Sequence, residues 1–539
     1  MRELGATPVP QAPRFGRVTG FVLAGGLALQ VLTGIGLGVH YSPATTTAWG
    51  SVVHLEEQVL LGRFLRGLHA FGASAVVICL LLHLLQKAWR LDLARKLGWW
   101  LGLALVPLLS AFSLTGYLLP WDQRGYWATR VASGIMAGTP LVGPLAERVF
   151  LGGADLGTLT LTRFFTVHAV VLPLSLVALG ALALLVWRRE ARLEEAPEAT
   201  PYFPCHATRD LATWLVVALA VALLAGLVGA HLEAPADPGS DFDPRPEWYF
   251  APLRELLKTV PEPLGSVAVP GLVFLLLAAL PFFAHRRGRA RAAVALPFAA
   301  WLGLLLWTSH KDLRDSAYQA GRATAAADAA LARELSRAGI PPEGPGDLLR
   351  LHPPRHGRAL FVEHCQRCHR VGNEVLEAQE QGPKLAGYLS LTWLKGVIRQ
   401  PRHEDYFGRT KIDDMPEMTE PAALADLPRI ALYVRSLDPT VRGLDPAEVA
   451  AGRAAYVKQG CMGCHKTEPV AREKASDLGA NLAGYGSPAW LKAFLKDPGS
   501  PLFYCDANEM PAYAELSEQE LDALVVYLRG LDPTRAAQD

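Results

Sequence analysis

Two Cys-x-x-Cys-His strings stand near the end of this 539-residue chain, at 365–369 and 461–465. Two thiols at this spacing can add to the two vinyl groups of one haem, and the adjoining histidine then becomes an axial ligand. A zinc or thiol redox site is the alternative for an isolated Cys-x-x-Cys pair. Two copies, each with the adjacent histidine, favour two covalently attached haems. The predicted attachment residues are Cys365 and Cys368 with the ligand His369, and Cys461 and Cys464 with the ligand His465.

Both strings belong to an internal repeat. GRALFVEHCQRCH recurs as GRAAYVKQGCMGCH, LAGY recurs as LAGY, and YVRSLDP recurs as YLRGLDP. Each copy also holds a Met-Pro pair, at Met415 and Met510, and a thioether opposite the histidine raises the reduction potential of a haem. Met418 is an alternative to Met415, which is favoured because it aligns with Met510. The two modules, 354–440 and 444–535, each resemble a class I cytochrome c domain, whose haem is attached outside the cytoplasm.

Histidines also lie inside apolar segments, where ionisable residues are costly and point to function. His69 and His83 are 14 residues apart, which on a helix is close to four turns and a rise of about 21 Å. Their rings then face one way at two depths, as two haems stacked across a membrane require. His168 in a later apolar segment lies at the depth of His69, and these two predict one bis-histidine site. For either histidine of the first helix alone, a hydrogen bond to a neighbouring helix is the competing interpretation.

Glycines repeat the same spacing in two other apolar segments. Gly20 and Gly34 are 14 residues apart, and so are Gly102 and Gly116. Small residues let a neighbouring helix or a porphyrin approach the helix backbone closely. Because the spacing equals that of the two histidines, a porphyrin is the favoured neighbour.

The elements that must position these residues are transmembrane helices. Fifty-one per cent of the residues are hydrophobic and 19% are charged, which argues against a disordered chain and an ordinary soluble enzyme. The net charge of +1 gives no indication of a nucleic-acid partner. Seven apolar runs each approach the roughly 20 residues that span a bilayer as a helix. They lie at 18–40, 66–89, 98–119, 164–187, 211–231, 267–284 and 291–309.

Positive charge predicts the orientation of these spans. Arginine and lysine gather before the first span, after the second and fourth, and between the last two, so this side is predicted to be cytoplasmic. An odd number of spans then places the C-terminal part outside the cytoplasm of a bacterial inner membrane. The sequence thus predicts an all-α protein, a seven-helix haem-binding bundle followed by two small helical cytochrome c domains. Its predicted parts are 1–197 and 198–310 in the bundle, a linker with a short helix at 311–353, and the two modules.

Four motifs carry a resemblance to a known family over residues 15–310. RFLRGLHAFGAS, TGYLLPWDQRGYWAT, TLTRFFTVHAVVLP and PEWYF resemble the cytochrome b subunit of Rieske/cytochrome bc complexes. Seven spans and the spacing between His168 and Pro173 are similar to the chloroplast and cyanobacterial branch, where this region is divided into two polypeptides. The resemblance implies that Arg66 pairs with a propionate of the outer haem b. It also implies that Glu247 of the PEWY motif lies at an outer quinol-oxidation site, and it suggests a homodimer.

One departure from the family stands out. The family places a second histidine about 15 residues after His168, where this chain has Ala183. An inner haem b would then be held by His83 alone, by His83 with another donor such as His206, or be absent. The surviving glycine spacing favours a second haem b with altered ligation.

The predicted function is quinol oxidation at the outer membrane face. A carboxylate in a partly apolar pocket has a raised pKa and can accept a proton from quinol, and Glu247 is the candidate. Tyr126 and Tyr249 are predicted to line the same pocket, with an interfacial aromatic belt as the alternative. A Rieske iron–sulfur protein must be a separate polypeptide, because no Rieske-type cysteine pairs occur here. Two other functions are a quinone reductase running in the opposite direction and a membrane-anchored dihaem electron carrier. A downstream cytochrome or terminal oxidase would receive the electrons.

Overall fold

A computed structural model describes residues 8–9, 18–90, 96–192, 200–240, 242–262, 264–283, 287–371, 382–469, 478–503 and 508–533. Their regular secondary structure is almost entirely helical, which confirms the all-α prediction; the strands among these residues are the two-residue β1 (Pro8–Val9) and β2 (Thr200–Pro201), which pair with each other. The chain divides into two compact units, Met1–Leu348 and Leu349–Asp539. Some of the basic residues used to predict orientation lie outside the described residues, namely Arg2, Arg14, Arg17, Arg95 and Arg286.

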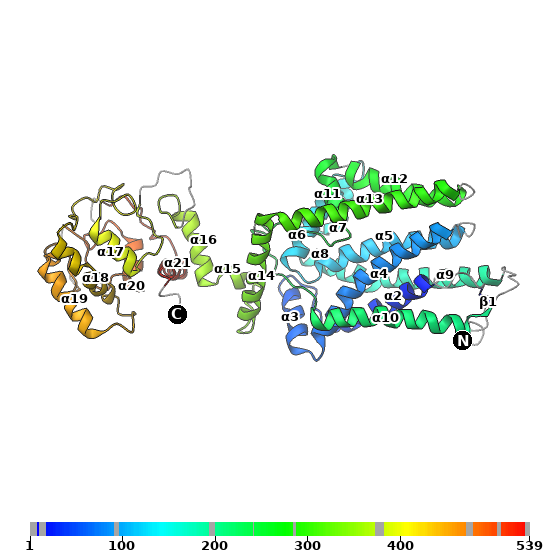
Figure 1. Cartoon of the computed structure of the whole chain (residues 1–539), viewed down its shortest axis with the longest axis horizontal. Coiled ribbons are helices and arrows are strands. Elements are labelled where there is room, and N and C mark those ends of the chain that lie inside the picture. The colour runs from blue at the N-terminus through cyan, green and yellow to red at the C-terminus, as the bar shows by residue number, and fades with distance from the viewer. Residues whose placement is uncertain are drawn as a thin grey trace. The chain divides into compact units, whose positions relative to one another are not determined.

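The first unit is a bundle of long apolar helices that run side by side (Figure 1). Seven segments of the described chain are long and apolar enough to cross a membrane, which confirms a multi-pass membrane protein. They are built from α2 (Val18–Gly38), α4 (Gly62–Arg90), α5 (Lys96–Leu118), α8 (Thr158–Thr166) with α9 (Leu172–Arg192), α10 (Ala207–Leu227), α12 (Val269–Ala279) and α13 (Arg287–Arg314).

Short helices gather at one end of this bundle, which we call the loop end (Figure 1). The loop end comprises α3 (Ala48–Gln58), α6 (Gln123–Ala137), α7 (Gly143–Leu151) and α11 (Ala251–Thr259). The helix α6 begins there because the Asp122 side chain accepts a hydrogen bond of 2.8 Å from the backbone N–H of Gly125. A π-helical turn, Val167–Val171, joins α8 to α9 and contains His168. Such turns are frequent at functional sites.

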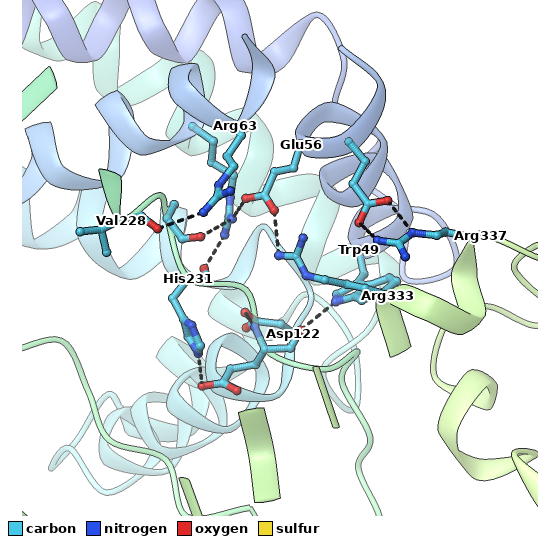
Figure 2. A network of polar contacts seen from close by, with 12 residues as sticks. Trp49, Glu56, Arg63, Asp122, Val228, His231, Arg333 and Arg337 are labelled. Atoms are coloured by element: carbon cyan, nitrogen blue, oxygen red, sulfur yellow. Dashed lines mark hydrogen bonds and ion pairs between the residues drawn. The ribbon is translucent and has the colours of Figure 1, made fainter. Parts of the chain in front are cut away.

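The segment predicted to link bundle and modules is partly a fixed element of the bundle. It forms the 21-residue helix α14 (Ser316–Ser336), which Asp315 caps by accepting from the N–H of Tyr318. Arg333 of α14 contacts Glu56 of α3 at 2.7 Å, and Glu56 also pairs with Arg66 of α4 (Figure 2). The chain therefore leaves the bundle at the loop end, and residues up to Leu348 belong to the bundle unit.

The second unit contains six helices of eight residues or more among its described residues. The repeat partners are α16 (Pro353–His364) and α19 (Pro446–Lys458), α17 (Leu391–Arg399) and α20 (Pro488–Lys496), and α18 (Pro421–Ser436) and α21 (Glu518–Gly530). A four-residue helix, α15 (Asp347–Arg350), precedes them in sequence, and the short turn Cys461–Gly463 lies in the second Cys-x-x-Cys-His string.

The two repeats do not pack as separate globules. Helix α16 of the first repeat packs on α21 of the second, and α18 of the first packs on α19 of the second. Glycines permit both crossings: a Cβ on Gly357 would lie 1.9 Å from the carbonyl oxygen of Ala523, and one on Gly452 would lie 2.3 Å from that of Arg429. The ranges 354–440 and 444–535 therefore mark sequence repeats, whereas each packing unit combines halves of both.

Reciprocal ion pairs join the ends of the two repeats. Arg435 contacts Asp532 at 3.0 Å, and the aligned pair, Arg529 and Asp438, lie 3.4 Å apart. Both aspartates are fully buried, so breaking either pair would leave an uncompensated charge in the interior. The recurring R-x-L-D sequence thus serves contact between repeats.

The buried ion pair of Glu56 predicts how α14 is held. Its side chain is only 5% exposed, so Glu56→Gln should weaken the docking of α14 by about 3 kcal/mol, because two arginines lose their counter-charge. Trypsin should then cleave after Arg333 about 100-fold faster, since cleavage follows the population of the locally opened state. Glu57→Gln is the matched control: its partner Arg337 is 65% exposed, and such pairs contribute at most about 1 kcal/mol. Equal cleavage rates in both variants would contradict this account.

Candidate functional site

His69 and His168 face each other within the bundle. Their ring centres lie 6.3 Å apart, with an angle of 66° between the ring planes. Metal–imidazole bonds are about 2 Å long, so two imidazoles that share one metal ion have ring centres about 6 Å apart. The structure thus brings together the predicted pair, from α4 and the π-helical turn, at a separation that fits axial ligation of one haem.

Threonines fix the tautomer of both rings. Thr33 donates its single hydroxyl proton to the carbonyl of Leu29 at 2.7 Å, so it must accept from the Nδ1–H of His69 at 2.9 Å. Thr115 donates to the carbonyl of Ala111 at 2.7 Å and accepts from the Nδ1–H of His168 at 3.1 Å. Each Nε2 then carries the lone pair that binds a metal.

The glycines make room for the imidazoles themselves. A Cβ on Gly34 would lie 3.4 Å from Cε1 of His69, and one on Gly116 would lie 2.5 Å from Cε1 of His168. The structure places an imidazole ring against each of these two glycines, with the hydrogen-bonding threonine one residue before it. The predicted close approach of a porphyrin at these positions remains a prediction.

His83 is also held by a Thr-Gly pair, but the position opposite it, where the second ligand would lie, has no such arrangement. A Cβ on Gly20 would lie 3.2 Å from its Cε1, and Thr19 lies 3.1 Å from its Nδ1 while donating to Gln86 at 2.7 Å. At the fourth glycine, Gly102, the preceding residue is Leu101, and a Cβ there would meet the side chain of Leu84 at 3.2 Å. The chain therefore lacks both the fourth histidine, where Ala183 stands exposed, and the threonine that would orient it. His206 lies in the turn before α10.

An ionic cluster at the loop end contains Glu247. Its carboxylate lies 3.7 Å from Arg124, which lies 3.7 Å from Glu233, which accepts from His231 at 2.8 Å. Figure 2 shows His231 with this partner. Burial raises the pKa of Glu247 above its ordinary value, with Asp122 acting in the same direction and Arg124 opposing it. One-third of the Glu247 side chain remains exposed, so a proton has a way in and out.

The two predicted tyrosines lie in different surroundings. Tyr249 is next to Glu247, and burial raises its pKa to about 12. Tyr126 packs edge-on against Trp121 and Trp127, and its charged neighbours are Asp155, Arg130 and Asp237. Only Tyr249 is therefore placed with Glu247. The sequence reasoning missed Arg124, although it lies inside the WDQRGYW motif.

Arg66 contacts protein groups at the loop end. It pairs with Glu56 and donates to the carbonyl oxygens of His231 at 2.7 Å and Ala230 at 3.2 Å. Its predicted role with a haem propionate remains a prediction.

In the second unit both Cys-x-x-Cys-His histidines also have a fixed tautomer. His369 donates its Nδ1–H to the carbonyl of Pro383 at 2.8 Å, and His465 donates to that of Ala480 at 2.9 Å. Each Nε2 is left to bind a metal. A cavity of about 670 Å³, within the usual range for ligand pockets, is lined by Cys461, Cys464 and His465 together with Met415 and Met418. These residues fit a covalently attached haem.

Comparison with known proteins identifies three regions of the chain. Residues 6–191 match the family model Cytochrome b/b6/petB, and residues 243–320 match Cytochrome b(C-terminal)/b6/petD. Residues 447–528 match Cytochrome C oxidase, cbb3-type, subunit III. The two cytochrome b matches contain the three candidate haem ligands His69, His83 and His168, and also Glu247.

Individual relatives agree. Cytochrome b of Solanum tuberosum is 32% identical over 282 residues, which cover 50% of this chain and 70% of that protein. Cytochrome b of Marchantia polymorpha is 33% identical over 282 residues and is covered to 68%. A solved chain described as Hyperthermophilic respiratory Complex III shares the fold, with a TM-score of 0.51 and 24% identity over 57% of this chain and 87% of that one. This chain belongs to the cytochrome b family, and it carries a cytochrome c region fused behind its membrane bundle.

Proposed function

We propose that this chain is the quinol-oxidising core of a bc-type quinol–cytochrome c oxidoreductase. The observation that carries the proposal is the last turn of α5, which contacts both candidate sites. Thr115 and Gly116 position His168, while Ser113 hydrogen-bonds the side chain of Tyr249 and Tyr117 donates to the carbonyl of Arg245 at 3.3 Å. The same helix end thus contacts the candidate haem ligand His168 and the segment that carries Glu247, which supports a redox centre and a proton acceptor close to each other, as oxidation of a quinol requires.

Haem would supply one-electron acceptors: haem b between His69 and His168 for one electron of quinol, and two haems c for the electron that leaves through a Rieske partner. The protein residues handle the protons. Glu247 with its raised pKa accepts a proton, and Arg124, Glu233 and His231 continue the chain of charges to the surface, where the His231 side chain is 54% exposed.

The partners follow from what this chain supplies and lacks. No Rieske-type cysteine pairs occur in its sequence, so the iron–sulfur protein is a separate polypeptide. The likeness to a respiratory Complex III chain supports a membrane complex of this kind, dimeric by analogy, which delivers electrons to a downstream cytochrome or terminal oxidase. We place the complex in a bacterial inner membrane with the loop end and the cytochrome c region on the periplasmic side. The exit of the chain beside α3 supports placing both on one side.

We further propose that a second haem b is held by His83 alone. Thr19 keeps His83 in the ligand tautomer, which a merely structural histidine does not require. Leu101 and Ala183 stand where the matching threonine and histidine would be, so we assign no protein ligand to the opposite face. Electron transfer to an inner quinone site is not part of this proposal.

Replacing Glu247 tests the proton acceptor. Glu247→Gln should slow quinol-dependent reduction of the c-type haems about 100-fold, the usual range for loss of a general base. Since the pKa of Glu247 is raised and only its carboxylate accepts a proton, the wild-type rate should fall as the pH drops through that pKa. The variant should lose this pH dependence. Glu262→Gln, an exposed glutamate outside the ionic cluster, is the control. A wild-type rate in Glu247→Gln would favour the electron-carrier alternative.

The inner site is tested by restoring what is missing. Wild-type protein should contain two haems b per chain, one of them high-spin and able to bind carbon monoxide when reduced. Ala183→His with Leu101→Thr should convert that haem to a low-spin form that no longer binds carbon monoxide, at unchanged haem content. Ala181→His with Leu101→Thr is the control, since residue 181 is displaced by about half a helical turn. A wild-type chain with a single haem b would rule out this assignment.

A further inference from the structure

We infer that each c-type haem site is shared between the two repeats. His465 of the second repeat would ligate its iron opposite Met415 of the first, and His369 of the first repeat opposite Met510 of the second. This exchange rests on the proposed covalent haems, but the intertwining of the chain that underlies it is independent of any haem. The repeat alone suggests the opposite, a histidine and a methionine from the same module.

The cavity of about 670 Å³ is the direct observation. From the second repeat it is lined by Cys461, Cys464 and His465, and from the first by Met415 and Met418. Side chains of α17 and α18, including Trp393 and Ile430, complete its apolar wall. No methionine of the second repeat lines this cavity.

The structural equivalence of the repeats selects Met415 over Met418. The N–H of Met418 donates to the carbonyl of Arg399 at the end of α17, at 3.0 Å, and the N–H of Tyr513 donates to that of Leu495 in α20, at 2.9 Å. The sequences MPEM and MPAY align Met418 with Tyr513, and both residues make this type of contact with the last turn of their preceding helix. The counterpart of Met510, three residues earlier, is Met415.

The other site shows the same exchange. The hydroxyl of Tyr513 donates to the carbonyl of His364, the residue before Cys365, at 2.9 Å, and the two rings lie 5.8 Å apart. The segment that carries Met510 is thereby held against the first Cys-x-x-Cys-His string. Aromatic rings meet in both helix pairs: the ring centres of Phe361 in α16 and Tyr527 in α21 lie 5.3 Å apart, and those of Tyr456 in α19 and Tyr433 in α18 lie 5.2 Å apart. The two sites are therefore equivalent: in each, the Cys-x-x-Cys-His string of one repeat is combined with the methionine segment and C-terminal helix of the other repeat.

The short connection between the repeats explains the exchange. Only residues 437–445 separate α18 from α19, and a short connection favours antiparallel packing of the two helices it joins. Once α18 packs on α19, it is no longer available to α16, the repeat partner of α19. Helix α16 therefore packs on α21, the repeat partner of α18. Short hinges between equivalent units are known to favour such swapping. Asp438 braces the hinge by accepting from the N–H and the hydroxyl of Thr440, at 2.9 and 2.7 Å.

A spectroscopic label on one haem at a time tests the assignment in the full-length matured protein. Cys461→Ala leaves one vinyl group of its haem unreacted, which shifts the absorption of that haem to longer wavelength, and Cys365→Ala labels the other. In the Cys461→Ala background, Met415→Ala should lower the reduction potential of the labelled haem, because a thioether ligand raises it. In the Cys365→Ala background, Met415→Ala should lower the reduction potential of the unlabelled haem. Met510→Ala should do the reverse, and Met418→Ala is the matched control.

The inference would be overturned if Met415→Ala lowered the reduction potential of only the haem attached to Cys368, or lowered the potentials of both haems equally. Met415→His, which keeps a ligand, replaces Met415→Ala if that variant does not accumulate, and the haem that shifts is read in the same way. Absence of covalent haem from the wild-type chain would instead count against the proposed function and leave the intertwining to a second experiment.

That experiment is cleavage at a protease site inserted at Gly443, in the exposed part of the hinge. In the intertwined arrangement the fragment after the cut should remain with the membrane until the protein is unfolded, because α16 and α18 of the membrane-bound part hold α21 and α19. Release of this fragment as a folded soluble protein under native conditions would overturn the inference.

Discussion

The membrane part of this protein depends on one recurring interaction, a Thr-Gly pair of one helix against a histidine of the next. The glycine lets the imidazole lie against the backbone, and the threonine accepts from Nδ1–H because its own proton is already donated. Both are needed: space without the hydrogen bond leaves the ring free to turn, and the hydrogen bond without space keeps the helices apart. His69, His83 and His168 all make this contact. The fourth position differs, since Leu101 replaces the threonine and Ala183 replaces the histidine.

Much of this site could be predicted from sequence because its geometry is periodic. A spacing of 14 residues fixes the face and depth of a helical side chain, so His69, His83 and the four glycines were found by counting. Arg124 was missed because its role arises between segments: it meets Glu233 and Glu247, which are more than 100 residues away in sequence. The docking of α14 was missed for the same reason, since an alanine-rich amphipathic segment does not reveal which surface will hold it.

The pairing of the repeats could not be predicted for a different reason. Because GRALF and GRAAY, and YVRSLDP and YLRGLDP, are nearly equivalent, α16 offers α18 and α21 almost the same contacts, and the sequence of the interface does not distinguish the two pairings. What distinguishes them is chain connectivity, which acts through loop-closure entropy rather than through contacts. Because the hinge is short, α18 and α19 are close in sequence and pack on each other at a small entropic cost. The ion pairs Arg435–Asp532 and Arg529–Asp438 then stabilise this pairing of the repeats.

The loop end connects these features physically. Glu56 pairs with Arg333 of the helix leading to the cytochrome c region (Figure 2). It also pairs with Arg66, whose guanidinium donates to the carbonyls of Ala230 and His231. His231 in turn holds Glu233, and through Arg124 the chain of charges reaches Glu247. Because Glu56 is buried and shared, the same side chain stabilises the exit of the polypeptide along α14 and, through Arg66, the backbone of Ala230 and His231. The exit of the chain and the side chains that contact Glu247 therefore belong to one polar network at the loop end.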